Sequence, residues 1–317
     1  MPQKRVGLWF YTNEHGHVIR QEIVDRLEAA GLDVTYDFDM RECYCLNGQV
    51  FTRDGINLSE MDVFHYMNAE ERNDHQHDML RLIEESGVEM FNSYASYTYA
   101  NDKFLANCKL RQAGVNVADS MLIPVNFDED RIRRIFDEWK SFIIKPRDKI
   151  CATGIMKIDS YEKFYDFYLF AKEFVGNLYI ERYIPFEKRD IRVEIFDDEV
   201  VGDGFSRVMG HSFKTNVRSG GRATFIPAED DAKQTALDAA RALGITTTIV
   251  DMVRNTETGE PYVLEVNPLL GVFYGAHYAS LGQPVPEYFA EIDKVKIEYI
   301  VRHIIRLADP SAALPKQ

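Results

Sequence analysis

The fold and the function are best predicted from two short stretches near the end of the chain, Val250-Asp251-Met252-Val253 and Tyr262-Val263-Leu264-Glu265-Val266-Asn267-Pro268. Both are rich in strand-forming residues and a glycine-containing turn separates them, so they predict an antiparallel hairpin. Glu265 and Asn267 are two residues apart and therefore share a face, and Asp251 can lie opposite them. Three oxygen donors on a rigid hairpin suit Mg²⁺, which takes few protein carboxylates and completes its shell with water and substrate phosphates.

A surface hairpin with solvated acids is the alternative interpretation, and the Glu-x-Asn pattern alone would favour it. Motifs elsewhere in the chain favour a nucleotide-dependent site instead.

Composition narrows the class of protein. The chain has 317 residues, 45% of them hydrophobic, which is enough for a large core and two or three domains. Its 51 acidic and 37 basic residues give a net charge of −14, which argues against nucleic-acid and anionic-membrane partners. Four scattered cysteines and the absence of a signal peptide or a long apolar run predict a cytoplasmic protein with reduced thiols.

The first part of the chain alternates between strand and helix patterns, which predicts a parallel sheet. The expected strands cover residues 6–11, 34–38, 63–67 and 88–91, and the expected helices cover 18–30 and 70–86. We therefore expect a Rossmann-like domain over residues 1–97, with a linker at 93–96.

Two α+β segments follow, over residues 98–184 and 185–317. The first begins with a helix capped by Asn101 or Asp102 and contains a buried strand at 141–146. The second begins with a hairpin from residues 190–196 to 200–208 and ends with a helix over 286–307, which we expect to pack on the N-terminal sheet.

Glycine-rich phosphate-binding motifs are absent, since neither G-x-G-x-x-G after the first strand nor G-x-x-x-x-G-K-[ST] occurs. Lysines can hold phosphates instead. Lys145 ends the apolar strand Phe142-Ile143-Ile144, and this position favours phosphate binding over a snorkelling surface lysine. Lys103, in the first turn of a helix, would by itself be interpreted as solvated.

Residues 181–184, Glu-Arg-Tyr-Ile, follow a strand, and Asp190-Ile191-Arg192 begins the next one. Backbone amides of such a hinge can form hydrogen bonds with the edge of an adenine base. A carboxylate there can accept hydrogen bonds from the ribose hydroxyls, and Arg192 can point toward the phosphates. The loop 213–221 adds cations, an amide and two adjacent glycines, a composition suited to stabilising charge during phosphoryl transfer.

Taken together, these stretches resemble the ATP-grasp superfamily, most closely its RimK-type glutamate ligases and lysine-biosynthesis carrier-protein ligases. The resemblance spans most of the chain. It is carried by Asn101-Asp102-Lys103, Ile144-Lys145-Pro146, Glu181-Arg182-Tyr183-Ile184, Asp190-Ile191-Arg192, Phe213-Lys214-Thr215-Asn216 with Gly220-Gly221, and Asp251 with Glu265-Val266-Asn267. One departure is the loop 147–154, which has a single glycine where this family usually has several.

The resemblance implies an N-terminal Rossmann-like domain followed by two α+β domains that clasp ATP. It places Lys103 and Lys145 on the phosphates and Asp190 on the ribose, and it assigns Mg²⁺, with Mn²⁺ as an alternative ion, to Asp251, Glu265 and Asn267. It also implies that residues 181–184 contact adenine. Lys214, Thr215 and Asn216 would contact the nucleotide or metal-bound phosphate. Arg192 and Arg218 would contact the transferring phosphoryl group or the substrate carboxylate.

The implied chemistry is carboxylate–amine ligation through an acylphosphate, which needs no protein nucleophile. An ATP-grasp kinase and a non-catalytic nucleotide-binding regulatory protein are the alternatives. The substrates can be amino acids, peptides or small metabolites, and a homodimer and a homotetramer are both compatible with the resemblance.

Overall fold

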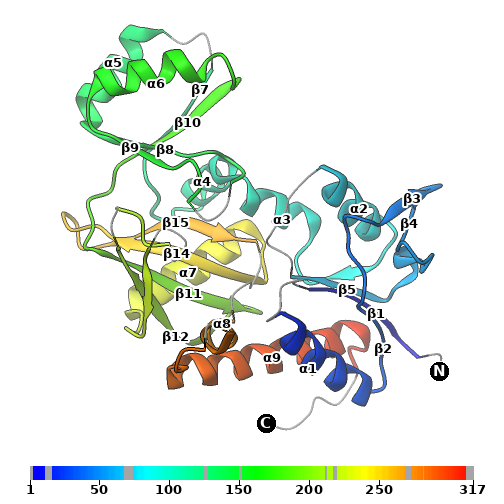
Figure 1. The fold of residues 1–317 in the computed structure, drawn as a ribbon. Coiled ribbons are helices and arrows are strands. Elements are labelled where there is room, and N and C mark those ends of the chain that lie inside the picture. The colour runs from blue at the N-terminus through cyan, green and yellow to red at the C-terminus, as the bar shows by residue number, and fades with distance from the viewer. Residues whose placement is uncertain are drawn as a thin grey trace. The chain divides into compact units, whose positions relative to one another are not determined.

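The computed structural model describes residues 3–10, 16–67, 74–124, 128–149, 152–210, 213–216, 220–268, 273–280 and 282–311 (Figure 1). The contacts divide the chain into two compact units, one formed by residues 1–97 together with 269–317 and the other by residues 98–268. The expected division at residues 97 and 184 stays a prediction, since residues 98–184 and 185–268 fall in one unit.

A four-stranded parallel sheet organises the first unit, with the strand order β2-β1-β5-β6. Its central strands are almost fully buried, as expected for a parallel sheet covered on both faces. The elements of this unit are β1 (Arg5–Trp9), α1 (Gly16–Ala29), β2 (Asp33–Thr35), β3 (Tyr44–Leu46), β4 (Gln49–Phe51), η1 (Leu58–Glu60), β5 (Val63–Tyr66), α2 (Asp74–Glu85), β6 (Glu89–Met90), α8 (Tyr274–Ser280) and α9 (Glu287–Ala308). The expected parallel sheet is confirmed, and α9 packs against α1 and β5 as predicted.

The expected linker at 93–96 is wrong, because α3 (Tyr94–Asn101) begins there. The Ser93 hydroxyl oxygen accepts a hydrogen bond from the backbone N–H of Ser96 (3.1 Å), which is the contact made by a helix N-cap. A serine at this position therefore starts a helix, although the same residue type is also frequent in linkers.

The second unit contains two antiparallel sheets. The first has the order β7-β10-β8-β9, and α5 and α6 lie side by side on one of its faces (Figure 1). Asp128 and Ser160 cap these helices through their side chains, and aromatic residues such as Phe142 and Phe164 fill the core beneath them. The elements are β7 (Ser120–Pro124), α5 (Glu129–Trp139), β8 (Phe142–Ile144), β9 (Met156–Ile158), α6 (Tyr161–Ala171) and β10 (Asn177–Arg182).

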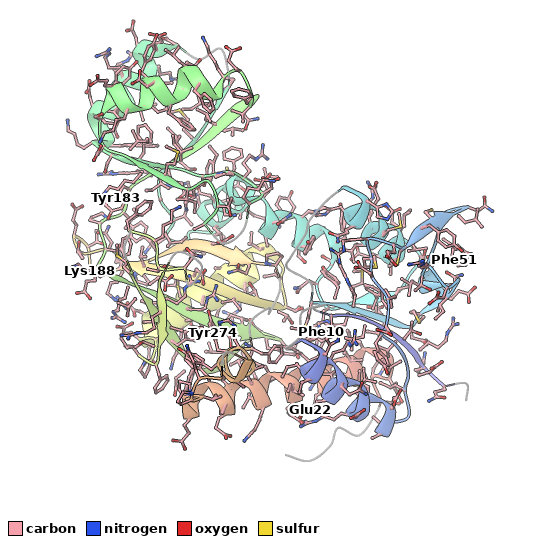
Figure 2. The ribbon with its side chains drawn as sticks, in the orientation of Figure 1. Phe10, Glu22, Phe51, Tyr183, Lys188 and Tyr274 are labelled. Carbon is pink, nitrogen blue, oxygen red and sulfur yellow. The ribbon has the colours of Figure 1, made fainter. Side chains whose placement is uncertain are left out.

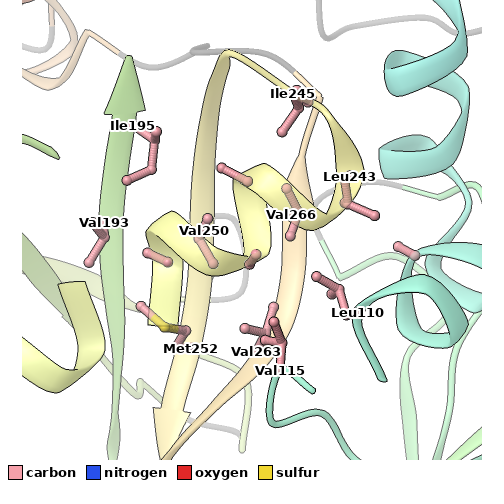
Figure 3. Packing of buried hydrophobic residues seen from close by; sticks show 14 of the residues in the cluster. Leu110, Val115, Val193, Ile195, Leu243, Ile245, Val250, Met252, Val263 and Val266 are labelled. Carbon is pink, nitrogen blue, oxygen red and sulfur yellow. The ribbon is translucent and has the colours of Figure 1, made fainter. Parts of the chain in front are cut away.

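The second sheet has the order β13-β12-β11-β14-β15 and is covered by α7, whose buried alanines let the helix approach the strands closely (Figure 3). The predicted hairpin of β14 and β15 is confirmed, with Asp251 paired across from Glu265. The elements are β11 (Arg189–Phe196), β12 (Glu199–Val208), β13 (Arg222–Thr224), α7 (Asp230–Leu243), β14 (Thr247–Arg254) and β15 (Pro261–Asn267).

Helix α4 (Lys103–Gln112) precedes the first of these sheets in sequence and contacts its strand β7, but it also packs against α7 and β15 of the second. Its residues Ala106 and Leu110 belong to the core formed by α7 and β15. Asp102 caps the helix by accepting hydrogen bonds from the backbone N–H groups of Phe104 and Leu105, as the sequence predicts. Lys103 is therefore held beside the strand that carries Glu265.

A β-bulge changes the register between β11 and β12. Glu194 pairs with Val201, but Arg192 pairs with Phe205, so β12 contains two more residues than β11 over this interval. Gly204 lies in the bulge with φ +70°, a conformation that glycine adopts without strain.

Among the described residues, every helix is too short or too polar to span a bilayer.

We predict that Gly204→Ala destabilises the protein more than Gly244→Ala. Both glycines have positive φ, but a Cβ at Gly204 would lie 2.9 Å from the backbone oxygen of Arg192, whereas a Cβ at Gly244 meets nothing within 4 Å. Strain alone costs about 1–2 kcal/mol, and overpacking adds about 1–3 kcal/mol at Gly204. Urea denaturation of both variants measures the difference, and equal losses of unfolding free energy would show that the bulge is not tightly packed.

Candidate active site

A cleft of about 840 Å³, a volume that includes the solvent at its mouth, lies within the second unit. Its walls come from both antiparallel sheets of that unit, from α4 and from the segment 213–216. Apolar side chains such as Ile143, Ile155 and Leu264 alternate with charged ones, a combination typical of a small-molecule site.

The cleft brings together most of the predicted site residues. Its lining includes Lys103, Lys145, Glu181, Arg182, Tyr183, Ile184, Asp190, Lys214, Thr215, Asn216, Asp251 and Glu265. Arg192 is bound to Asp251, Asn267 lies two residues after Glu265 on β15, and Arg218 falls outside the described residues.

The segment between β10 and β11 forms one edge of the cleft, and Figure 2 labels Tyr183 and Lys188 within it. The backbone N–H of Arg182 donates to Asp119 O (2.7 Å), and that of Tyr183 donates to Ser141 O (3.1 Å). The backbone N–H of Ile184 has no acceptor among the described residues and belongs to a residue that lines the cleft, so it is a donor that a ligand can use.

Lys145 and Glu181 form a buried ion pair in the wall of the cleft. The Lys145 Nζ lies 2.5 Å from Glu181 Oε2, and the two side chains are less than a tenth exposed. The Tyr179 hydroxyl donates to the other carboxylate oxygen, Glu181 Oε1, at 2.6 Å. Lys145 therefore does not snorkel to solvent, in agreement with the interpretation based on its apolar strand.

Lys103 is also buried, although its sequence context alone suggested a solvated side chain. Its Nζ lies 3.0 Å from Glu265 Oε1 and donates to the backbone oxygen of Lys149 at 2.6 Å. The Lys103 backbone N–H donates to Arg147 O (3.0 Å), and the Arg147 guanidinium pairs with the capping residue Asp102. Loop 147–149 thereby fixes the start of α4.

Four buried charges meet on the second sheet, where β11, β12 and β14 are neighbours. Arg207 donates to both oxygens of Asp190, and its Nη2 also donates to Asp251 Oδ2 at 2.9 Å. Arg192 binds Asp251 through Nε (2.7 Å) and Nη2 (3.1 Å). The Thr215 hydroxyl donates to Asp190 Oδ2 at 2.5 Å.

These contacts set the ionisation of Asp251. Burial alone would raise the pKa of this carboxyl, but the positive charges of Arg192 and Arg207 outweigh burial and lower the pKa to about 2. Burial and Arg192 oppose the charged form of Arg207, yet Asp251 and Asp190 dominate and raise the pKa of its guanidinium. Both groups are therefore charged at neutral pH.

The predicted metal ligands are partly assembled. Asp251 and Glu265 lie opposite each other across β14 and β15, and the Asn267 amide donates to Ile249 O at 3.0 Å. Among the described residues, no group of three or more His, Cys, Asp or Glu side chains has the geometry of a metal site. The donor set of two carboxylates and one amide nevertheless consists of oxygens, and this chemistry fits Mg²⁺ or Mn²⁺.

The segment 213–216 lies over the cleft. The Lys214 Nζ donates to the backbone oxygen of Ala152 (3.1 Å), and the backbone oxygen of Asn216 accepts from the N–H of Gly221 (3.0 Å). A Cβ at Gly221 would collide with the backbone of Thr215, so only glycine permits this close approach.

Sequence reasoning missed Arg207 and Tyr179. Arg207 lies opposite Asp190 on β12, but the bulge near Gly204 shifts the register that a simple hairpin would give. Tyr179 is two residues before Glu181 and therefore on the same face of β10, and this spacing is the signal that could have identified it.

We predict that Arg207→Gln makes the protein sensitive to acid at a higher pH. Asp251 has a lowered pKa in the folded state, so its stabilising contribution is present above pH 4 and is lost as the pH falls toward 2. Without Arg207, that pKa rises and the loss begins at higher pH. Asp190 then loses its cation and Asp251 keeps only Arg192, a loss that costs about 3–5 kcal/mol at neutral pH.

Thermal melting across pH 2–8 measures this effect. Arg241→Gln is the control, because Arg241 pairs with the exposed Asp198 and its removal is expected to change stability little. Identical pH profiles for the Arg207 variant and the native chain would contradict the assigned ionisation of Asp251.

Comparison with known proteins gives the family. A model of the RimK-like ATP-grasp domain matches residues 100–275. A probable alpha-L-glutamate ligase of Legionella pneumophila (strain Corby) is 25% identical over 197 residues, which cover 61% of this chain and 64% of that protein. The glutamate–LysW ligase ArgX of Sulfolobus acidocaldarius is 23% identical over 169 residues, which cover 51% of this chain and 58% of the relative.

Solved structures agree on the fold. The ATP-grasp ligase PsnB, complexed with a minimal precursor, Mg and ADP, superposes with a TM-score of 0.64 at 18% identity, over 94% of this chain and 99% of that one. The chain matches 64% of the length of the Legionella protein, so the sequence similarity covers only part of each chain. The fold and the resemblance inferred from the motifs are confirmed: the chain belongs to the RimK-like ATP-grasp family.

Proposed function

We propose that the protein is an ATP-dependent carboxylate–amine ligase. The observation that carries this proposal is one cleft that contains three buried cations, Lys103, Lys145 and Arg207, beside the oxygen donors Asp251 and Glu265. Cations suit a triphosphate and the oxygen donors suit its metal ion. Relatives named as glutamate ligases support the same reaction class.

The adenine base is expected at the edge formed by residues 181–186. Apolar side chains there, including Ile143, Ile184 and Phe186, can cover the two faces of a purine. The backbone N–H of Ile184 can donate to a ring nitrogen. The ribose contact predicted for Asp190 requires an oxygen that Thr215 and Arg207 now occupy, so it would depend on a change of partner at that carboxylate.

The phosphates would replace carboxylates as partners of the cations. Lys103 now binds Glu265, and Arg207 binds Asp251, so each of the two carboxylates predicted to hold the metal is neutralised by a cation of the cleft. Transfer of the cations to phosphate would leave Asp251 and Glu265, together with Asn267, to hold Mg²⁺. When bound, the ion supplies charge neutralisation at the phosphates during transfer.

The reaction would proceed in two displacements. An oxygen of the substrate carboxylate attacks the γ-phosphorus, the bond to the β–γ bridging oxygen breaks, and ADP leaves. The amine nitrogen then attacks the carbonyl carbon of the acylphosphate, inorganic phosphate leaves, and the amine proton passes to phosphate or water. Lys103, Lys145 and Arg207 stabilise the charge that develops on the transferring group, and Arg192 and Arg218 stay candidates for the same task.

Glutamate is the first substrate to test, because relatives carry that amino acid in their names. PsnB is described with a precursor peptide, so peptide carboxylates and amines belong in the same screen. We place the reaction in the cytoplasm, where ATP is abundant.

We predict that ADP release requires ATP, Mg²⁺, a carboxylate and an amine together. Lys145→Met is expected to lower kcat/KM for ATP by a factor of about 10²–10³, the usual cost of losing one charge-stabilising donor. Lys163→Met is the matched control, because Lys163 lies on α6 and pairs with the exposed Asp159. A coupled assay for ADP and mass spectrometry of the products measure both variants.

Two outcomes would reject the ligase. Release of ADP with a hydroxyl acceptor and no amide product would indicate a kinase. Tight ATP binding with no turnover across amino-acid and peptide pairs would indicate a regulatory nucleotide-binding protein.

A further inference from the structure

Tyr179 and Glu181 project from the same face of β10, because they are two residues apart on one strand. The Tyr179 hydroxyl donates to Glu181 Oε1 at 2.6 Å, and both residues are at most 5% exposed. Glu181 lines the cleft, and Tyr179 lies behind it. The phenol therefore acts on the cleft through the carboxylate.

Lys145 completes this arrangement from the neighbouring strand. Its backbone N–H donates to Tyr179 O at 3.0 Å, which places the two residues opposite each other where β8 ends. Its Nζ lies 2.5 Å from Glu181 Oε2. The two oxygens of Glu181 thus have different donors, a neutral phenol on Oε1 and an ammonium on Oε2.

The phenol is itself held from behind. The Phe104 ring packs edge-on against the Tyr179 ring, with centroids 5.6 Å apart. Ser120, which pairs with Glu181 across β7 and β10, donates its hydroxyl proton to Asn107 Oδ1 at 2.9 Å. Burial and the adjacent Glu181 charge raise the pKa of Tyr179, so its hydroxyl keeps its proton and remains a donor.

We propose that Tyr179 is a positioning residue for phosphate binding, which fixes the Glu181 carboxylate so that its second oxygen directs the Lys145 ammonium toward the nucleotide phosphates. This inference rests on the proposed function, since it takes the cleft to be a nucleotide site. The inference adds Tyr179, which does not line the cleft, to the residues that affect phosphate binding.

Tyr179 can affect Lys145 because the single negative charge of Glu181 is shared between two hydrogen-bond donors. A buried carboxylate needs a donor for each oxygen, and a charged hydrogen bond is stronger than a neutral one. With Tyr179 in place, Glu181 keeps one partner when Lys145 turns to phosphate. Without the hydroxyl, Lys145 is the only donor described for that carboxylate, and the ammonium is held back from the phosphates.

The test compares the dissociation constants of ATP and adenosine for the full chain, measured by competition with a fluorescent ATP analogue. Tyr179→Phe is expected to raise the constant for ATP about tenfold, the effect of one lost hydrogen bond to a charged group. Adenosine has no phosphate, so its constant is expected to change by less than about twofold. An equal loss for both ligands would overturn the proposal, because a purely structural effect does not distinguish them.

A double-mutant cycle tests whether Tyr179 acts through Glu181. In a Glu181→Gln background, Tyr179→Phe is expected to add less than about a twofold effect on ATP binding, and a full tenfold addition would overturn the proposal. Tyr66→Phe is the control, since it removes a buried tyrosine hydrogen bond, to Asn92 O, in the other unit. Failure of the native chain to bind ATP would reject the proposed function itself, whereas ATP binding that Tyr179→Phe leaves unchanged would reject only this inference.

Discussion

The guanidinium of Arg207, buried between Asp190 and Asp251, is the interaction on which the second unit depends. It joins β11, β12 and β14 through side chains, and together with Arg192 it keeps the buried Asp251 carboxylate ionised. Such carboxylates are stable in a sheet only when each has a cation and hydrogen-bond donors. The bulge at Gly204 contributes to this pairing, because beyond it Arg207 lies opposite Asp190.

Buried carboxylates elsewhere in the cleft are also paired with cations. Lys145 pairs with Glu181 on the first sheet, and Lys103 of α4 pairs with Glu265 on the second. Each cation thus resides in a low-dielectric site without leaving an uncompensated charge. These are the groups that we propose to bind a nucleotide, and in that proposal their partners are exchanged rather than created. Preorganised charge of this kind is effective in catalysis, since little reorganisation remains during the reaction.

Much of this could be predicted from the sequence. The hairpin of β14 and β15 follows from its strand pattern, and Lys145 follows from the apolar strand before it. The burial of Lys103 could not be predicted from its neighbours in the sequence, because it depends on Glu265, which is far away in the chain. Arg207 was missed because a bulge, with two extra residues on one strand, alters cross-strand pairing. The helix at Tyr94 was missed because Ser93 serves equally in linkers and caps.

Helix α4 packs with the second sheet although the strands of the first sheet follow it in the chain. The two walls of the cleft are therefore connected covalently only through residues 113–119 and 183–188. A triphosphate gripped by Lys103 and Arg207 from one wall and by Lys145 from the other would act as a cross-link between them. The bound ligand would then help to hold the two walls together, and slower amide hydrogen exchange near the cleft would report its presence even at strands that it does not touch.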